Sequence, residues 1–509
     1  MEERAFRAAY LANASDFASC SLLAVSLRHL LTMVYLVVYT YANLRLGRDA
    51  PQDDSPTVKP VAQTELIITH EDIDRAHDRV RVSRARAKRG FSSNARLLWL
   101  LAGPGVLVML GENDGPSMLA YAATGAKFGI GFFLPFVILT FCMAIVVQEM
   151  TVRLGAATHR GHAELIFDRF GPFWGWFSMI DLGIGNFLTL ITEFIAIRAG
   201  LGYFGVPPWI AVLLALIVLF SALMSHRYWT WERITLAAAA FNLIFIPVAL
   251  MTHPHWPAVG RALITWHPLP GFNKETLLLV LADIGATVTP WMLFFQQSAT
   301  VDKGMTTKDI HFGRIDTVLG AALASAAALA TILATAPLFA HTMTADNFQA
   351  AEFAQALQPI IGRFGASLFA LGMVEAGIVA AITISTSSAY AFGEVARKPH
   401  SLNLPMSEGK SFYAVLTLCA IAAAAIVLIP GLPLVYVVLL VNVVAVLAMP
   451  PALVFLFMLV NDKEVMGDLA SPVWANILAS GVVFILTAAG ILFGLSILFP
   501  NIFAVLGGQ

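Results

Sequence analysis

The chain contains few charged residues, and this shortage limits what it can be. Of its 509 residues, 12% are charged and 58% are hydrophobic, whereas soluble domains carry about 25% charged residues. The mean hydropathy is +0.76. These values exclude an ordinary soluble domain and indicate a polytopic membrane protein with the lipid bilayer as its partner. The net charge of -1 supplies no excess of cations for phosphate, so a nucleic-acid partner is not expected.

Cysteine is also scarce. Cys20, Cys142 and Cys419 are far apart and show neither metal-ligand nor redox spacing, so we interpret them as apolar filler. Nucleophile–base pairs, phosphate-binding loops and metal-hydrolase spacings do not stand out either. We therefore expect neither an enzyme nor a bound cofactor.

Apolar runs long enough to cross a bilayer, which takes about 17–25 residues, repeat along the chain. They lie near 97–123, 129–151, 174–203, 207–225, 233–252, 276–300, 316–340, 366–392, 412–430, 433–460 and 473–499. The prediction is an all-α polytopic membrane protein with about 11 transmembrane helices.

Cationic residues occur before the first span and after the even-numbered spans. They are Arg84, Arg86, Lys88, Arg89 and Arg96 before the first span, Arg153, Arg160 and Arg169 after the second, Arg227 and Arg233 after the fourth, Lys303, Lys308 and Arg314 after the sixth, and Arg397, Lys398 and Lys410 after the eighth. The opposite loops at 202–208 and 429–433 carry none. The positive-inside rule therefore predicts a multi-pass protein of the cell (inner) membrane with a cytoplasmic amino terminus.

Residues 1–95 differ from the rest of the chain. The apolar run at 30–44 is short and leads into a mostly polar stretch, 49–74, without a clean signal-peptide cleavage site. We expect a largely disordered, cytoplasmic N-terminal extension. A surface-lying helix, a short extra span and an upstream start codon are the alternatives.

A charge and a helix break coincide in the first span. Asp114 is followed at once by Gly115 and Pro116, and an ionised aspartate at the bilayer centre costs about 2.5–3.5 kcal/mol on insertion scales. Pro116 lacks the N–H that would bond the carbonyl of Glu112, so the break also supplies a free oxygen. This pattern predicts an ion site.

A second proline interrupts the sixth span. Pro290, in the run 285–291, leaves the carbonyl of Ala286 without its helical donor. Interrupted helices at matching positions of two halves point to a transporter site between inverted repeats. The alternative is a tolerated kink, which is common in membrane helices.

The motifs around these breaks resemble those of the NRAMP divalent-metal transporter family from about 102 to 467. The first span reads GPGVLVMLGENDGPSMLAYAATGAKFG, where that family has Gly-Pro-Gly, Asp-Pro-Gly-Asn, Gly-Ala and Phe-Gly at the same offsets. The run 285–290 is similar to the family's Gly-Ala-Thr-Val-Met-Pro, the run 461–467 to its Ser-Asp-Lys-Lys-Leu-Met-Gly loop, and 153–155 with 163–165 to the loop after its second span.

The resemblance implies a five-plus-five inverted-repeat fold with discontinuous helices 1 and 6 and alternating access to a cation site at the membrane midplane. Its first repeat, helices 1–5, would occupy 96–252, its second repeat, helices 6–10, would occupy 276–460, and an additional helix 11 would occupy 473–499. Carried over by position, the metal-binding residues implied are Asp114, Ser117, Glu193, Ala286 through its carbonyl, and Asn442.

The sequence departs from the family pattern at the proposed ligands. The family's methionine is Thr289 and its histidine is Trp291. Because a thioether suits transition ions while oxygen ligands suit hard ions, the replacement predicts a substrate of Mg²⁺, with Mn²⁺ also accepted. This pattern resembles the NRAMP-related magnesium transporter branch. Without that histidine, the site lacks a group that titrates near neutral pH, so transport without proton coupling is predicted.

Other polar residues and other functions remain open at this point. Glu112 and Gln297 are further candidate metal ligands, and Asp181, Asp283 and Glu375 are intramembrane acids that either line a pathway or are paired structurally. A proton-coupled manganese or iron symporter of the ordinary NRAMP type is the nearest alternative. An organic-solute transporter and a non-transporting receptor are more distant alternatives, and the oligomeric state is not predicted.

Overall fold

The computed structural model describes residues 103–223, 227–265, 274–340, 350–432 and 434–498, and a few side chains within these ranges are also outside the description. The predicted extension at 1–95 therefore lies outside the described residues, and its predicted disorder is not tested.

Every regular element within these ranges is helical, which confirms the all-α prediction. The α-helices are α4 (Pro104–Glu112), α5 (Gly115–Phe128), α6 (Phe133–Thr158), α7 (His162–Phe170), α8 (Pro172–Gly202), α9 (Pro208–Leu223), α10 (Tyr228–Ala239), α11 (Phe245–Met251), α12 (Trp256–Thr265), α13 (Lys274–Gly285), α14 (Pro290–Asp302), α15 (Ile310–Thr335), α16 (Ala350–Ala396), α17 (Lys410–Val427), α18 (Leu434–Asn461), α19 (Lys463–Met466) and α20 (Val473–Leu498). Short 3-10 helices are η2 (Ala240–Ile244), η3 (Thr307–Asp309), η4 (Ala336–Ala340) and η6 (Gly467–Leu469).

Among the described residues, eight helical segments are long and apolar enough to cross a membrane. The other three predicted spans correspond to α9, α18 and the α4–α5 pair. The largest difference is α16, which begins at Ala350 rather than near 366. Gly362 adopts a positive φ of 72° there, so the helix continues upstream across a kink that a search for uninterrupted apolar runs does not cross.

Both predicted breaks are present. Helix α4 ends at Glu112 and α5 begins at Gly115, with Asp114 as its N-cap and Pro116 in its first turn. Helix α13 ends at Gly285 and α14 begins at Pro290. Proline is favoured in a first turn because the N–H that it lacks would have no helical acceptor there. Each proline therefore starts a new helix.

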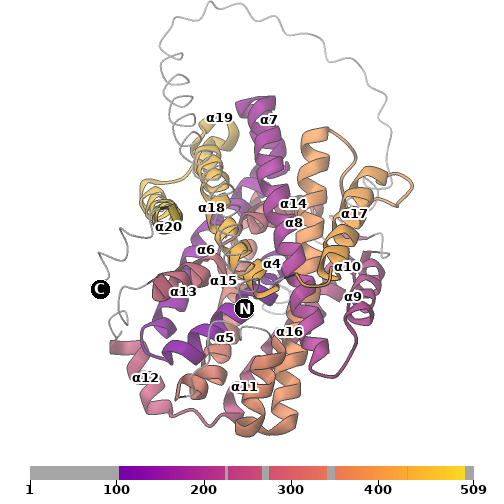
Figure 1. Cartoon of the computed structure of the whole chain (residues 1–509). Coiled ribbons are helices and arrows are strands. Elements are labelled where there is room, and N and C mark those ends of the chain that lie inside the picture. Colours follow the sequence, from indigo (N-terminus) through magenta and orange to yellow (C-terminus); the bar gives the residue numbers. More distant parts are fainter. Residues whose placement is uncertain (1–102, 224–226, 266–273, 341–349, 433, 499–509) are drawn as a thin grey trace, which may run out of the picture.

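The broken helices lie among the longer ones (Figure 1). Helix α15 packs against α4, α5 and α6, while α16 packs along α8. Glycines allow the closest approaches, because a Cβ on Gly105 would lie 2.6 Å from the Thr317 nitrogen and one on Gly125 would lie 2.3 Å from the Ile332 carbonyl oxygen. Small residues at such contacts let membrane helices approach closely.

A buried polar network holds the amino-terminal end of α4. Asp316 of α15 accepts hydrogen bonds from the backbone N–H groups of Gly103 at 2.9 Å and Gly105 at 2.6 Å. Nearby, Lys303 Nζ and Glu232 Oε2 form an ion pair at 2.7 Å in which both side chains are fully buried. Since an unpaired buried charge is costly, the Asp316 bonds hold the start of α4, and with it the first break, against α15, while the ion pair joins α10 to the end of α14.

Candidate metal centre

Asp114 lies at the first break as the cap of α5. Its Oδ1 accepts a hydrogen bond from the Ser117 backbone N–H at 2.8 Å, and its side chain is 2% exposed. The first turn of a helix carries N–H groups without helical acceptors and a partial positive charge. This environment holds a carboxylate at a depth where one is otherwise unfavourable.

A second carboxylate meets the same helix end. Glu193 of α8 accepts from the Gly115 N–H through Oε2 at 3.0 Å, while its buried Oε1 has no hydrogen-bond partner in the described structure. Gly115 makes this approach possible, because a Cβ there would lie 2.3 Å from the Cβ of Ala196. Glu193 thus lies beside the break, as the resemblance implied, with one carboxylate oxygen available to a cation or a proton.

Glu112 connects the two breaks. Its Oε2 accepts a hydrogen bond from the Thr289 hydroxyl at 2.8 Å, and its buried Oε1 has no partner among the described residues. Trp291, which is 1% exposed, packs against the same segment, since a Cβ on Gly111 would lie 3.3 Å from its ring. Thr289 therefore presents a hydroxyl where the family that the sequence resembles has a methionine thioether. The Trp291 ring occupies the space beside Gly111.

The carbonyl of Ala286 is engaged by a side chain that sequence reasoning missed. The Tyr121 hydroxyl of α5 donates to this carbonyl at 3.0 Å and lies 3.2 Å from Thr287 Oγ1. The oxygen that Pro290 leaves without a helical donor is therefore bonded across the two broken helices. Tyr121 follows Pro116 by five residues, and no motif pointed to it.

Asn113, inside the first break, extends the polar contacts to α16. Its Nδ2 donates to Asn242 Oδ1 at 3.0 Å and to the Ala324 carbonyl at 2.8 Å. Asn242 in turn donates from Nδ2 to Glu375 Oε2 at 3.4 Å. Glu375 is thus linked to the break through the amide of Asn242. Within the described residues, no hydrogen bond joins it directly to Asp114.

One predicted ligand, Gln297, makes its hydrogen bonds away from this centre, and another, Asn442, is not tested. Gln297 bonds the His162 ring through Oε1 at 3.1 Å and the Arg160 carbonyl through Nε2 at 2.9 Å. Burial lowers the pKa of His162 to about 4, so this ring is neutral at physiological pH. Gln297 lies seven residues beyond Pro290, about 10 Å along α14, because two turns of helix carry it away from the break. Asn442 is in α18, but its side chain is outside the described part.

The ligand set available is therefore oxygen-rich and partly neutral. Among the described residues, no three His, Cys, Asp or Glu side chains are grouped to hold one metal ion. A dication here would draw on the carboxylates of Asp114 and Glu193 together with hydroxyl, carbonyl and water oxygens. Hard cations such as Mg²⁺ are commonly held by one or two carboxylates with several waters retained.

Comparison with known proteins identifies the family. The profile described as "Natural resistance-associated macrophage protein-like", or Nramp, matches residues 105–496. The chain belongs to the Nramp family. It is similar to the divalent metal cation transporter MntH of Brucella suis, with 28% identity over 424 residues that cover 79% of this chain and 88% of that protein. The MntH of a Nostoc species is 27% identical over 401 residues, covering 75% and 88%.

A solved transporter structure shares the fold. The manganese transporter of Eremococcus coleocola, in complex with an aromatic bis-isothiourea substituted compound, superposes with a TM-score of 0.67 at 20% identity. The match covers 81% of this chain and 89% of that one. The Nramp fold, with its broken first and sixth helices, therefore accounts for how residues so distant in sequence meet. This family consists of membrane transporters rather than enzymes, as the sequence predicted.

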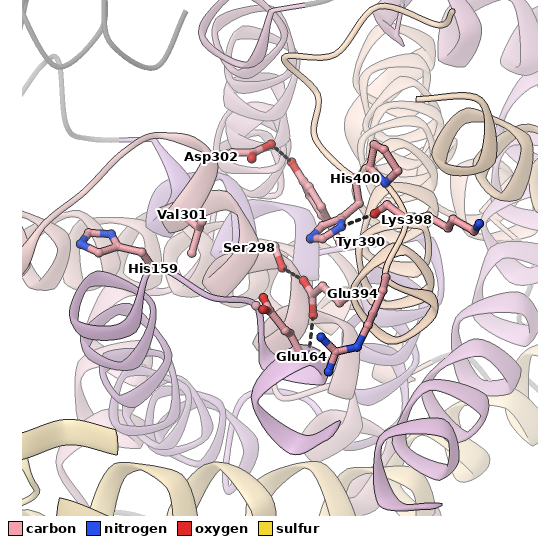
Figure 2. Close-up of a pocket in the computed structure, with 12 residues that line it drawn as sticks. His159, Glu164, Ser298, Val301, Asp302, Tyr390, Glu394, Lys398 and His400 are labelled. Atoms are coloured by element: carbon pink, nitrogen blue, oxygen red, sulfur yellow. Dashed lines mark hydrogen bonds between the residues drawn. The ribbon is translucent and has the colours of Figure 1, made fainter. Parts of the chain in front are cut away.

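A separate cavity of about 360 Å³ lies toward the carboxyl ends of α14 and α16 in this Nramp chain (Figure 2). Its acids are already bonded. Glu394 accepts from Ser298 Oγ at 2.5 Å and from the Ala163 N–H at 2.9 Å, and Asp302 accepts from the Tyr390 hydroxyl at 2.7 Å. These bonds join α7, α14 and α16, so the cavity wall has a structural role.

Gly115→Ala tests the close approach at the first break. The added Cβ would lie 2.3 Å from Ala196 Cβ, so α5 and α8 must separate and the Gly115–Glu193 bond must lengthen. We expect a thermal unfolding midpoint several degrees below wild type in detergent, because a strained helix contact of this kind costs about 1–3 kcal/mol.

The matched control is Gly183→Ala on α8, where an added Cβ meets nothing within 4 Å. Alanine is the better helix former by about 1 kcal/mol, so this variant should equal or exceed wild-type stability. A Gly115→Ala protein as stable as the Gly183→Ala protein would contradict the contact.

Proposed function

We propose that the protein carries a divalent metal cation across the membrane by alternating access to the centre between its two broken helices. The carrying observation is that Asp114 and Glu193 converge on the first turn of α5, with one Glu193 oxygen unpartnered and buried. Acids at membrane depth mark ion pathways. The naming of its MntH relatives as divalent metal cation transporters supports the same function.

The distribution of charge supports an orientation. Five cations lie near helix ends: Arg153 and Arg160 at the end of α6, Lys303 after α14, Arg314 in the first turns of α15 and Arg397 after α16. Helix α7, which follows α6 in the chain, lies at the top of the view in Figure 1, and α12 lies toward the bottom. By the positive-inside rule the side where these cations gather faces the cytoplasm. We propose that the chain enters the membrane from that side and that α12 lies toward the outer side. We also propose, on the basis of the family likeness, that the two inverted repeats occupy 96–252 and 276–460.

Access to the centre would require the helices to move. Asp114 is 2% exposed and Glu193 is fully buried. Toward the proposed outer side, the Tyr121–Ala286 bond joins α5 to the loop after α13, while toward the inner side Asp316 holds the start of α4. Opening one set of contacts while the other stays closed is the alternating access expected of broken-helix transporters.

The choice of ion rests on two different supports. The manganese transporter of Eremococcus coleocola shares the fold, which favours Mn²⁺ and a symporter of the ordinary Nramp type more directly than it favours magnesium. Thr289 and Trp291, in place of sulfur and imidazole, favour a site that binds through oxygen alone. We therefore propose Mn²⁺ as a substrate, with Mg²⁺ carried as well because the threonine offers no sulfur to discriminate against it.

Asp114→Ala should reduce uptake of Mn²⁺ and Mg²⁺ into proteoliposomes to the level of protein-free vesicles, because it removes the carboxylate at the cap of α5. Glu193→Ala should cause a smaller loss, since Asp114 would remain. Folding is checked by the elution profile and the thermal unfolding midpoint. Wild-type rates in a well-folded Asp114→Ala protein would show that the metal centre lies elsewhere.

Thr289→Met tests the ligand chemistry. The thioether cannot donate to Glu112 and presents a soft ligand, so Mg²⁺ uptake should fall at least several-fold while the ratio of Cd²⁺ or Mn²⁺ to Mg²⁺ transport rises. Thr289→Val is the matched control, because it also loses the hydroxyl but adds no sulfur. If the protein carries Mn²⁺ while millimolar Mg²⁺ neither competes nor enters, the oxygen-only proposal is wrong.

Proton coupling is tested in the same vesicles. In the described structure the carboxylates of Asp114, Glu112 and Glu193 accept hydrogen bonds from the backbone N–H groups of Gly115 and Ser117 and from the Thr289 hydroxyl, not from a histidine. We therefore propose transport driven by the ion gradient and membrane potential alone. A pH-sensitive dye in the lumen should report no change during metal uptake. Acidification at a fixed ratio to the metal carried would instead assign the chain to the proton-coupled symporters.

A further inference from the structure

Asp283 is a buried carboxylate that the centre described above does not use. It lies on α13, two residues before that helix ends, and is fully buried. The Thr124 hydroxyl of α5 donates to it, shared between Oδ1 at 3.2 Å and Oδ2 at 3.1 Å. Within the described ranges, this is the only side-chain hydrogen bond recorded for its carboxylate, and no Lys, Arg or His forms an ion pair with it.

Structural pairing does not account for this charge. A buried carboxylate is stabilised when a cation or several N–H donors compensate it, as the backbone donors of α4 do for Asp316. A single shared hydroxyl compensates only part of the charge on Asp283. An apolar residue there would cost less at this depth. The presence of an acid at this position therefore suggests a role other than structural pairing.

A column of oxygen atoms joins Asp283 to the break at Pro290. The Thr287 hydroxyl donates to the Asp283 carbonyl at 2.8 Å and lies 2.9 Å from Thr140 Oγ1. The Tyr121 hydroxyl lies 3.2 Å from Thr287 Oγ1 and donates to the Ala286 carbonyl at 3.0 Å. Thr124 and Tyr121 are three residues apart on α5, about 4.5 Å along the helix.

By bonding to one another, these groups hold α5 and α6 against α13 and the loop after it. The same groups are suited to bind a cation when these helices separate. Each hydroxyl has lone pairs that accept as well as a proton that donates, so it can turn its oxygen toward an ion. The column contains only oxygen and one negative charge. Hard divalent cations prefer such ligands and keep part of their water shell.

We propose that Asp283, with the hydroxyls of Thr124 and Thr287, forms an outer loading site for a partly hydrated divalent cation, from which the ion passes to Asp114 and Glu193. The inference rests on the transport function proposed above and on the proposed orientation, in which α13, the helix that follows α12 in the chain, lies toward the outer side. A single carboxylate binds weakly, so the site concentrates ions and releases them inward. The site should therefore increase the rate at which ions are captured from the outer side, without binding them tightly.

The test measures initial rates of Mn²⁺ uptake from the medium in intact cells, for wild type, Asp283→Asn, Thr124→Val and Asp114→Ala. Asparagine keeps the size of the side chain and still accepts from Thr124, but it lacks the charge. Because focusing by one sign of charge raises capture rates by about 10-fold or more, Asp283→Asn should raise the KM for external Mn²⁺ about 10-fold with a maximal rate near wild type.

Ionic strength separates electrostatic capture from a packing role. Salt screens attraction of the ion from solution, so the wild-type KM should rise with added salt and that of Asp283→Asn should rise less. Thr124→Val retains the charge and should keep the wild-type salt dependence with a KM raised about threefold. Asp181→Asn on α8 is the control for removing an intramembrane acid elsewhere, and its KM should stay within about twofold of wild type.

The outcomes separate the two proposals. Wild-type transport at Asp114→Ala would overturn the metal centre itself. If Asp114→Ala is inactive but Asp283→Asn has the KM and salt dependence of wild type, the outer site alone is overturned. If Asp283→Asn is poorly expressed, Thr124→Val decides: a wild-type KM, or loss of the salt dependence while Asp283 is present, also overturns the site.

Discussion

The hydrogen bonds at the first turn of α5 are the constraint on which the rest of the centre depends. Ser117 N–H bonds Asp114 and Gly115 N–H bonds Glu193, so two carboxylates from helices far apart in sequence share one helix end. A helix that ran unbroken through this point would have paired those N–H groups with its own carbonyls. The break therefore provides the N–H donors that stabilise two neighbouring carboxylates. Because Gly115 has no Cβ, α8 can approach closely enough for Glu193 to accept from the Gly115 N–H.

In this arrangement, the protein's own hydroxyls bond the oxygens that we propose for the ion. The Tyr121 hydroxyl bonds the Ala286 carbonyl, and the Thr289 hydroxyl bonds Glu112. A buried oxygen without a hydrogen-bond partner would cost about 1–3 kcal/mol of folding stability. The arrangement in which the centre is closed therefore needs these donors. The same hydroxyls can rotate, and exchanging one oxygen partner for an ion demands little rearrangement. The hydroxyl side chains that hold the centre closed are thus the same ones that can turn toward the ion.

The sequence predicted the helical class and both breaks, because proline and intramembrane charge leave strong local signals. Asp114 was named from those signals and Glu193 from the family resemblance, and their role as metal ligands stays a prediction. The sequence did not predict Tyr121, Asn242 or the Asp316 contacts to α4, since each depends on which helices lie side by side. Gln297 shows the reverse limitation. It was expected at the centre from its helix alone, yet His162 and Arg160, brought by α7 and its preceding loop, bond both ends of its amide.

The two breaks are unequal, and this asymmetry bears on selectivity. The first carries the charge through Asp114 and the flanking Glu112, whereas the second contributes neutral oxygens from Ala286 and Thr289. In a family whose second break has a thioether and an imidazole, replacing both leaves ion recognition to charge and cavity shape. Charge alone favours any small dication, so we propose that discrimination depends on how much water the ion retains beside the Trp291 ring. The proposed function thus depends on Trp291 as a wall of the site rather than as a ligand.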